Sequence, residues 1–153
     1  MNKIEIQRVY ESATVPDSKT LITWADNVLS ACKGDGEIVI RVVDQNESAE
    51  LNHRFRKRQG ATNVLSFCYE PLAGIPSNCI GDLVVCAPIV EQEAQQQNKS
   101  THAHWAHMVV HGVLHLLGFD HVEENQADAM EAKEMKLLAD LGFPNPYREI
   151  IVS

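Results

Sequence analysis

Three histidines stand close together between residues 111 and 121, at spacings typical of a transition-metal site. His111 and His115 are four residues apart, which on a helix places both side chains on one face, about one turn apart. Gly118 follows at a point where a helix typically ends with a left-handed residue, so the chain can turn back and bring His121 to the same ion. The sequence therefore predicts a metal site made of three histidines.

The spacing H-x3-H-x2-G-x2-H is that of the extended zinc motif of the metzincin proteases. Those enzymes have a glutamate after the first histidine as general base, and here Gly112 occupies that position. Gly112 either permits close packing or clears space beside the metal. In both cases peptide hydrolysis by the usual mechanism loses its base, which disfavours a protease. Asp120 either orients a histidine ligand or shapes the turn.

Residues 104–117 predict a buried central helix. On a helical wheel His104, His107, His111 and His115 fall within about 80° of one another, and apolar residues cover the remainder. A helix that is apolar nearly all round is buried, so its polar stripe consists of imidazoles. His104 and His107 fit best as buried histidines satisfied by hydrogen bonds, with His107 supporting the metal ligands from behind.

Four positive charges lie between residues 54 and 58, in a chain whose formal net charge is −8. That acidity argues against a general polyanion binder, because phosphate contacts need clustered Lys and Arg. The cluster itself, Arg54, Arg56, Lys57 and Arg58, could contact phosphates. For Arg54, Lys57 and Arg58 a solvated helix end, where cations complement the helix dipole, is an equally good explanation.

The remaining patterns predict an α+β domain: a small mixed sheet of about four strands, packed by about five helices, with the histidine helix at its centre. The expected strands cover residues 3–10, 37–44, 63–69 and 80–86, with the second and fourth of these in the middle of the sheet. The expected helices cover residues 17–32, 48–55, 88–98, 101–117 and 125–141. We expect one domain over residues 1–153. Whether the tail from about residue 145 is flexible is left open.

Composition points to a cytoplasmic protein that has no membrane partner. No apolar run reaches the ~18 residues of a membrane span, and the first ten residues do not resemble a signal peptide. The four cysteines form no C-x-x-C pair. We therefore expect four reduced thiols, mostly buried, rather than disulfides or a cysteine-zinc site.

Several separate motifs in this order resemble the YbeY family of bacterial metal-dependent endoribonucleases, also called rRNA maturation factors. The resemblance covers roughly residues 42–142 and rests on five stretches. They are Leu51-Asn52-x-x-Phe55-Arg56, Thr62-Asn63-Val64-Leu65-Ser66-Phe67, Gly81-Asp82-Leu83-Val84-Val85-Cys86, His104-Trp105-Ala106-His107 and the three-histidine signature.

The resemblance implies one zinc ion held by His111, His115 and His121, although another divalent transition metal stays open. It also implies that Arg56 is a catalytic arginine, and that the enzyme cleaves single-stranded RNA. The expected roles are 16S rRNA 3′-end maturation and ribosome quality control, with ribosomal RNA, the small ribosomal subunit and assembly factors as partners. The oligomeric state is left open.

Two other functions remain compatible with the residues. One is a ribosome-assembly factor that acts mainly by binding, with a structural zinc, since an acidic chain should bind naked RNA weakly. The other is a metal-dependent hydrolase of another substrate, including peptides, against which the missing glutamate counts.

Overall fold

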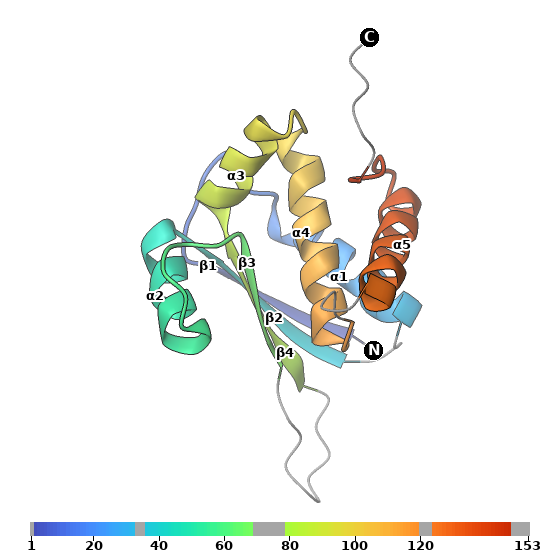
Figure 1. Cartoon of the computed structure of the whole chain (residues 1–153), viewed down its shortest axis with the longest axis horizontal. Coiled ribbons are helices and arrows are strands. Elements are labelled where there is room, and N and C mark those ends of the chain that lie inside the picture. The colour runs from blue at the N-terminus through green and yellow to red at the C-terminus, as the bar shows by residue number, and fades with distance from the viewer. Residues whose placement is uncertain (1, 33–35, 69–78, 120–123, 148–153) are drawn as a thin grey trace, which may run out of the picture.

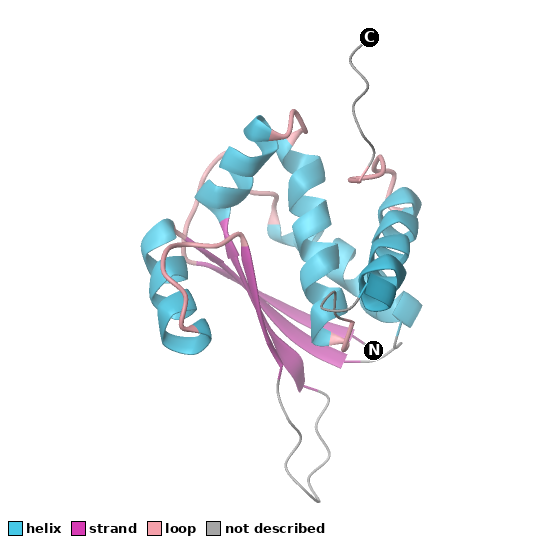
Figure 2. Cartoon of the chain, in the orientation of Figure 1, coloured by secondary structure: helices cyan, strands magenta, loops and turns pink. Residues whose placement is uncertain are grey.

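The computed structural model describes residues 2–32, 36–68, 79–119 and 124–147 (Figure 1). Within these ranges it contains four strands and five helices, which Figure 2 distinguishes by colour. The strands are β1 (Asn2–Arg8), β2 (Gly36–Val43), β3 (Val64–Cys68) and β4 (Cys79–Cys86). The helices are α1 (Ser18–Cys32), α2 (Gln45–Arg56), α3 (Ala87–Gln96), α4 (Thr101–Leu116) and α5 (Glu124–Asp140). This arrangement confirms the predicted α+β fold class.

The four strands form one mixed sheet in the order β1-β2-β4-β3. β1, β2 and β4 run parallel, and β3 pairs antiparallel with β4 at the edge of the sheet. β2 and β4 are therefore central, as the sequence predicts. Their runs of β-branched residues fit this position, because a central parallel strand is buried on both faces.

The two faces of the sheet carry helices of different kinds. Figure 1 shows α2 alone on one face, while α1 and α4 cover the other and α5 packs on the far side of α4. Alternating residues of β4 divide between the two cores: Leu83 and Val85 face α1 and α4, whereas Val84 and Cys86 belong to a smaller cluster beside α2. α4 consequently lies between the sheet and α5, which explains why it is apolar nearly all round.

The second helix begins earlier than the sequence pattern predicts, at Gln45 rather than Ser48. Asp44 caps it, because its side-chain carboxylate accepts a hydrogen bond of 2.9 Å from the backbone N–H of Glu47. From the sequence alone, an aspartate directly after a strand fits either the last residue of that strand or the N-cap of the next helix, so the start of the helix is ambiguous.

The four cysteines are free thiols, but the expectation that most are buried is wrong. Only Cys86 is buried; Cys32 is half-buried, and Cys68 and Cys79 are exposed. The reason is their position, since these three stand at the ends of α1, β3 and β4, where the elements leave the core.

In the described part of the chain, every helix is too short or too polar to cross a bilayer.

Candidate metal centre and active site

The histidine helix α4 has well-defined ends. Ser100 caps its start, and its hydroxyl accepts a hydrogen bond of 3.0 Å from the backbone N–H of Ala103. At the other end Gly118 adopts φ 98°. The N–H of Phe119 then bonds back to the carbonyl of Leu114 at 3.0 Å. This is the glycine-terminated helix end that the sequence predicts.

The Nε2 atoms of His111 and His115 face each other at 3.1 Å, and both rings are partly exposed. Two nitrogens bound to one tetrahedral zinc at their usual distance would lie about 3.3 Å apart. The pair therefore fits two ligands of one metal ion. The predicted third ligand, His121, and Asp120 lie outside the described residues.

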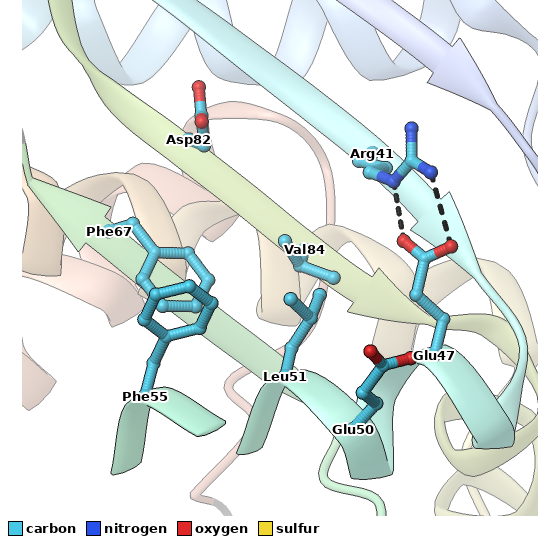
Figure 3. A pocket seen from close by; sticks show the side chains of 8 residues that line it. All are labelled: Arg41, Glu47, Glu50, Leu51, Phe55, Phe67, Asp82 and Val84. Carbon is cyan, nitrogen blue, oxygen red and sulfur yellow. Dashed lines mark hydrogen bonds and ion pairs between the residues drawn. The ribbon is translucent and has the colours of Figure 1, made fainter. Parts of the chain in front are cut away.

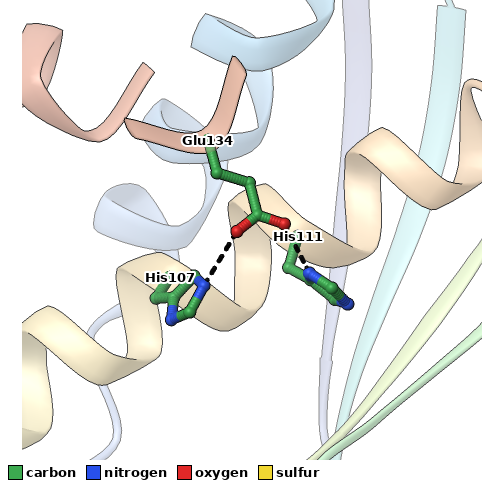
Figure 4. A group of neighbouring side chains, drawn as sticks. All are labelled: His107, His111 and Glu134. Carbon is green, nitrogen blue, oxygen red and sulfur yellow. Dashed lines mark hydrogen bonds and ion pairs between the residues drawn. The ribbon is translucent and has the colours of Figure 1, made fainter. Parts of the chain in front are cut away.

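Glu134 of α5 lies directly behind this pair, and Figure 4 shows its carboxylate between two histidine rings. Its Oε1 is 2.5 Å from Nδ1 of His111, and its Oε2 is 3.0 Å from Nε2 of His107. The hydroxyl of Tyr147 donates a third hydrogen bond, to Oε2. The side chain is 1% exposed. All three partners come from α4 or from the chain that follows α5.

Glu134 is ionised at neutral pH. Burial alone would raise the pKa of its carboxyl, but the hydrogen bonds from His107, His111 and Tyr147 outweigh burial and lower the pKa to about 2. A carboxylate can only accept hydrogen bonds, so the two rings donate to it. His111 therefore carries its proton on Nδ1, which leaves the lone pair of Nε2 directed toward His115.

Sequence reasoning missed Glu134, although a signal was present. The apolar face of α5 includes Met130, Leu137 and Leu138, all of which are buried. Glu134 stands four residues after the first of these and four before the last, so it lies on the same face. A charged side chain inside an apolar stripe calls for a partner on the neighbouring element.

His107, His111 and Glu134 themselves form a group that could hold a metal ion, since one ligand atom from each lies within 4.8 Å of the others; His107 and Glu134 are buried and His111 is partly exposed. This set shares His111 with the predicted histidine site, and the nitrogen of His111 that faces Glu134 is Nδ1. The structure thus offers two overlapping ways to bind a metal at one end of α4.

Arg56 reaches toward this region from the far side of the sheet. It is the last residue of α2, and its guanidinium donates a hydrogen bond to the carbonyl of Ser66 on the edge strand β3. It also lies 5.4 Å from the ring centroid of Phe67. The hydroxyl of Ser66 in turn bonds to the carbonyl of Gly112 at 3.2 Å, one residue after His111. Arg56 is thereby linked to the histidine helix through one strand residue.

Arg54, Lys57 and Arg58 are exposed around the same end of α2. The guanidinium of Arg54 lies over the ring of Phe55, 5.6 Å from its centroid. The contact with Ser66, which links α2 to the histidine helix, is made by Arg56. Their position suits either phosphate binding or the negative end of the helix dipole.

Gly112 faces the sheet. A Cβ at this position would lie 2.7 Å from Cδ2 of Leu83 and 3.2 Å from Cγ2 of Val64. Those distances are too short for ordinary contact, so the absence of a side chain permits α4 to pack closely on β3 and β4. Of the two explanations for Gly112, the structure favours packing.

His104 belongs to a separate polar cluster near the start of α4. Its Nε2 lies 3.0 Å from Oε1 of Glu93 on α3, and the side-chain amide of Asn63 donates to the same carboxylate at 3.1 Å. Burial lowers the pKa of His104 even though Glu93 opposes that effect. This cluster joins α3, α4 and the start of β3, and so serves the fold.

A hollow of about 530 Å³ opens on the α2 face of the sheet. Figure 3 shows the rings of Phe55 and Phe67, which meet edge to face, at one end of it and the ion pair of Arg41 with Glu47 at the other. Its lining also includes the carboxylates of Glu50 and Asp82. With three acidic side chains and one arginine, this hollow repels phosphates and is distinct from the histidine site on the opposite face.

Comparison with known proteins places the chain in a family. A family model described as Endoribonuclease YbeY matches residues 5–142. Endoribonuclease YbeY of Methylococcus capsulatus is 52% identical over 150 residues, which are 98% of each chain. Endoribonuclease YbeY of Pseudomonas putida is 49% identical over 152 residues, 97% of this chain and 95% of the relative.

A solved structure resembles the fold as well. The solution structure of TM1509 from Thermotoga maritima superimposes with a TM-score of 0.64 at 26% identity, covering 97% of this chain and 100% of that one. Since the family model and relatives of about half-identical sequence both span nearly the whole chain, the chain belongs to the Endoribonuclease YbeY family.

Proposed function

We propose that this chain is a zinc-dependent endoribonuclease that cleaves single-stranded RNA, acts in the cytoplasm, and matures the 3′ end of 16S rRNA. Its zinc is held by His111, His115 and His121, with one ion per chain. The observation that carries this proposal is the pair of facing Nε2 atoms, 3.1 Å apart, on a buried helix of a chain in an endoribonuclease family.

The donor set fits zinc better than harder ions. Imidazole nitrogens suit zinc and other late transition metals, whereas magnesium and calcium prefer oxygen ligands. When bound, zinc supplies a Lewis acid that polarises a phosphoryl oxygen. Three histidine ligands would leave one coordination position open, as in catalytic zinc sites.

The role of Arg56 in this proposal is to bind the scissile phosphate. A guanidinium has five N–H donors in a planar fork, and one of them is used on the carbonyl of Ser66. The rest can form charge-assisted hydrogen bonds to non-bridging phosphate oxygens, which strengthen as negative charge builds up in the transition state.

Arg54, Lys57 and Arg58 bind the phosphates that flank the cleaved bond. They concentrate positive charge at one end of α2, in a chain whose net charge is −8. The surrounding acidity would direct an RNA strand to this end and discourage binding elsewhere. The proposed substrate is ribosomal RNA within the small ribosomal subunit, and the proposed partners are assembly factors. The enzyme also serves ribosome quality control.

The low basicity of the chain also favours a second candidate, a ribosome-assembly factor whose zinc is structural. Adding back variants to cells depleted of the protein distinguishes the two. We expect that Arg56→Ala and His111→Ala both fail to restore the mature 3′ end of 16S rRNA. Full rescue by a folded, metal-free His111→Ala protein would instead favour a role in binding.

A further inference from the structure

We propose that Glu134 is a positioning residue of the metal centre. Its carboxylate holds the ring of His111 so that Nε2 points to the ion, and it does not itself bind the metal. This inference rests on the zinc site proposed above, and it decides between the two overlapping ligand sets at this end of α4.

The distance between Glu134 and His111 supports a hydrogen bond. Two atoms bound to one tetrahedral zinc would lie about 3.3 Å apart, whereas Oε1 and Nδ1 are 2.5 Å apart. A separation this far below about 3.3 Å does not fit two ligands of one ion; it fits a charge-assisted N–H···O⁻ hydrogen bond, which is shorter than a neutral one. The 3.1 Å between Nε2 of His111 and Nε2 of His115 is the spacing that fits two ligands.

The hydrogen bond from His111 to Glu134 also matches the usual surroundings of a histidine that binds a metal. A histidine that binds metal through one nitrogen commonly donates its other N–H to a carboxylate, which fixes the tautomer and orientation and raises the basicity of the ligand. Glu134 occupies that place for His111. Because Glu134 is buried, the effect of its carboxylate on the ring is little weakened by solvent.

The second oxygen of Glu134 keeps the carboxylate in place. His107 donates to Oε2 from α4, one turn before His111, and Tyr147 donates to the same oxygen from the chain beyond α5. Each bond restrains rotation of the carboxylate, so the position of one metal ligand depends on three further side chains. Tyr147 thereby couples the end of the described chain to the metal centre.

A carboxylate that merely joined α5 to α4 would also use these bonds. Metal affinity separates the two roles, since a joining residue affects the stability of the fold but leaves the preference of the folded protein for zinc unchanged. The chain offers a matched control in Glu93, which binds His104 of the same helix at 3.0 Å and lies in the separate cluster.

The test is a competition between the purified full-length protein and a fluorescent zinc chelator. We expect Glu134→Gln to lower zinc affinity about 10- to 100-fold, and Tyr147→Phe to lower it less, while Glu93→Gln leaves it unchanged. Unaltered zinc affinity in folded Glu134→Gln, or equal losses in Glu93→Gln and Glu134→Gln, would overturn the inference. Should Glu134→Gln fail to fold, Tyr147→Phe carries the comparison, and unaltered affinity there counts against the proposal.

The same assay tests whether Glu134 is a ligand. If it only positions His111, His115→Ala abolishes tight zinc binding and His107→Gln weakens it modestly. Loss of binding in His107→Gln with retention in His115→Ala would show that His107, His111 and Glu134 hold the ion. Failure of the proposed function is distinct, because it would appear as zinc-loaded wild-type protein that does not cleave RNA.

Discussion

The guanidinium of Arg56 donates a hydrogen bond to the backbone carbonyl of Ser66, on the edge strand that packs against the histidine helix. The hydroxyl of Ser66 bonds to the carbonyl of Gly112, beside His111. Arg56 is thus held near the proposed metal site by a neutral carbonyl, which does not cancel its charge. Its charge can therefore act on a phosphate.

Replacing Arg56 should affect catalysis far more than stability. We expect Arg56→Ala to lower kcat about 10²- to 10³-fold, the usual effect of losing one donor to transition-state charge. Arg56→Lys should retain only part of the wild-type kcat, because an ammonium group lacks the planar fork of donors that a guanidinium has. Melting temperature should change little, since the side chain is exposed. Steady-state cleavage of a single-stranded RNA gives the measurement, with Lys19→Ala, at an exposed lysine of α1, as control. An Arg56→Ala enzyme with normal kcat would contradict the assignment.

The three remaining cations should govern the salt dependence of RNA binding. If Arg54, Lys57 and Arg58 each contact a phosphate, replacing any one by alanine lowers the slope of log affinity against log salt by about 0.7 for a single strand. Binding is best titrated in the His115→Ala background, where the strand should stay intact. Lys19→Ala, at an exposed lysine of α1, should keep the wild-type slope. If the slope stays the same in all the variants, these cations do not contact phosphates and serve only to complement the helix dipole.

Two glycines that allow close packing should differ in how much they tolerate a methyl group. A Cβ at Gly81 would lie 2.2 Å from the backbone oxygen of Phe67, which cannot move without disturbing β3. At Gly112 the nearest atom is the end of the Leu83 side chain, at 2.7 Å. We expect Gly81→Ala to cost about 3 kcal/mol or more, and Gly112→Ala up to about 2 kcal/mol, since alanine regains helix propensity.

Urea unfolding of the metal-free proteins measures both free energies. The order matters more than the values, because relaxation of the core varies between sites. A Gly112→Ala protein more stable than wild type would show that α4 does not pack on the sheet through a close contact at Gly112. A Gly112→Ala protein less stable than Gly81→Ala would contradict the expected order and show that the side chain of Leu83 yields less readily than the backbone of Phe67.

His104 should make the stability of the metal-free protein fall below neutral pH. Burial lowers the pKa of His104 in the folded state from its ordinary 6.5, so the unfolded chain takes up a proton first. The free energy of unfolding then decreases as pH falls below about 6.5, until His104 protonates in the folded state too. His104→Gln removes this contribution.

The measurement is urea unfolding of wild type and His104→Gln, with a chelator present, at pH values of about 7.5 and about 5.5. These two values lie on either side of the ordinary histidine pKa, so the comparison isolates the contribution of His104 to the free energy of unfolding. The wild type should lose more stability between the two conditions than the variant does. Equal losses would mean that Glu93 compensates the buried charge fully, contrary to the direction of the pKa shift.

The histidine helix could be predicted from the sequence because its signals are local. Ser100 caps it, Gly118 ends it with φ 98°, and the spacing of His111 and His115 follows from helical periodicity alone. The central positions of β2 and β4 were predictable for a similar reason, since runs of β-branched residues indicate strands buried on both faces.

The partners of the histidines could not be predicted in the same way. Glu134 meets His111 only because α5 packs on α4, and Tyr147 reaches the same carboxylate from beyond the end of α5. Arg56 approaches α4 only through the carbonyl of an edge strand. Such pairings depend on the tertiary arrangement of elements, which periodicity and capping residues do not encode.

The most direct test of the metal-dependent nuclease compares three highly purified samples on one single-stranded RNA: the zinc-loaded wild type, the chelator-treated wild type and zinc-loaded His115→Ala. Removing either the ion or one of its two facing ligands should lower the cleavage rate at least about 100-fold, as expected for loss of a catalytic group that stabilises charge, and adding zinc back should restore only the chelated wild type. Equal rates in all three samples would contradict a zinc-dependent mechanism and point to a contaminating nuclease.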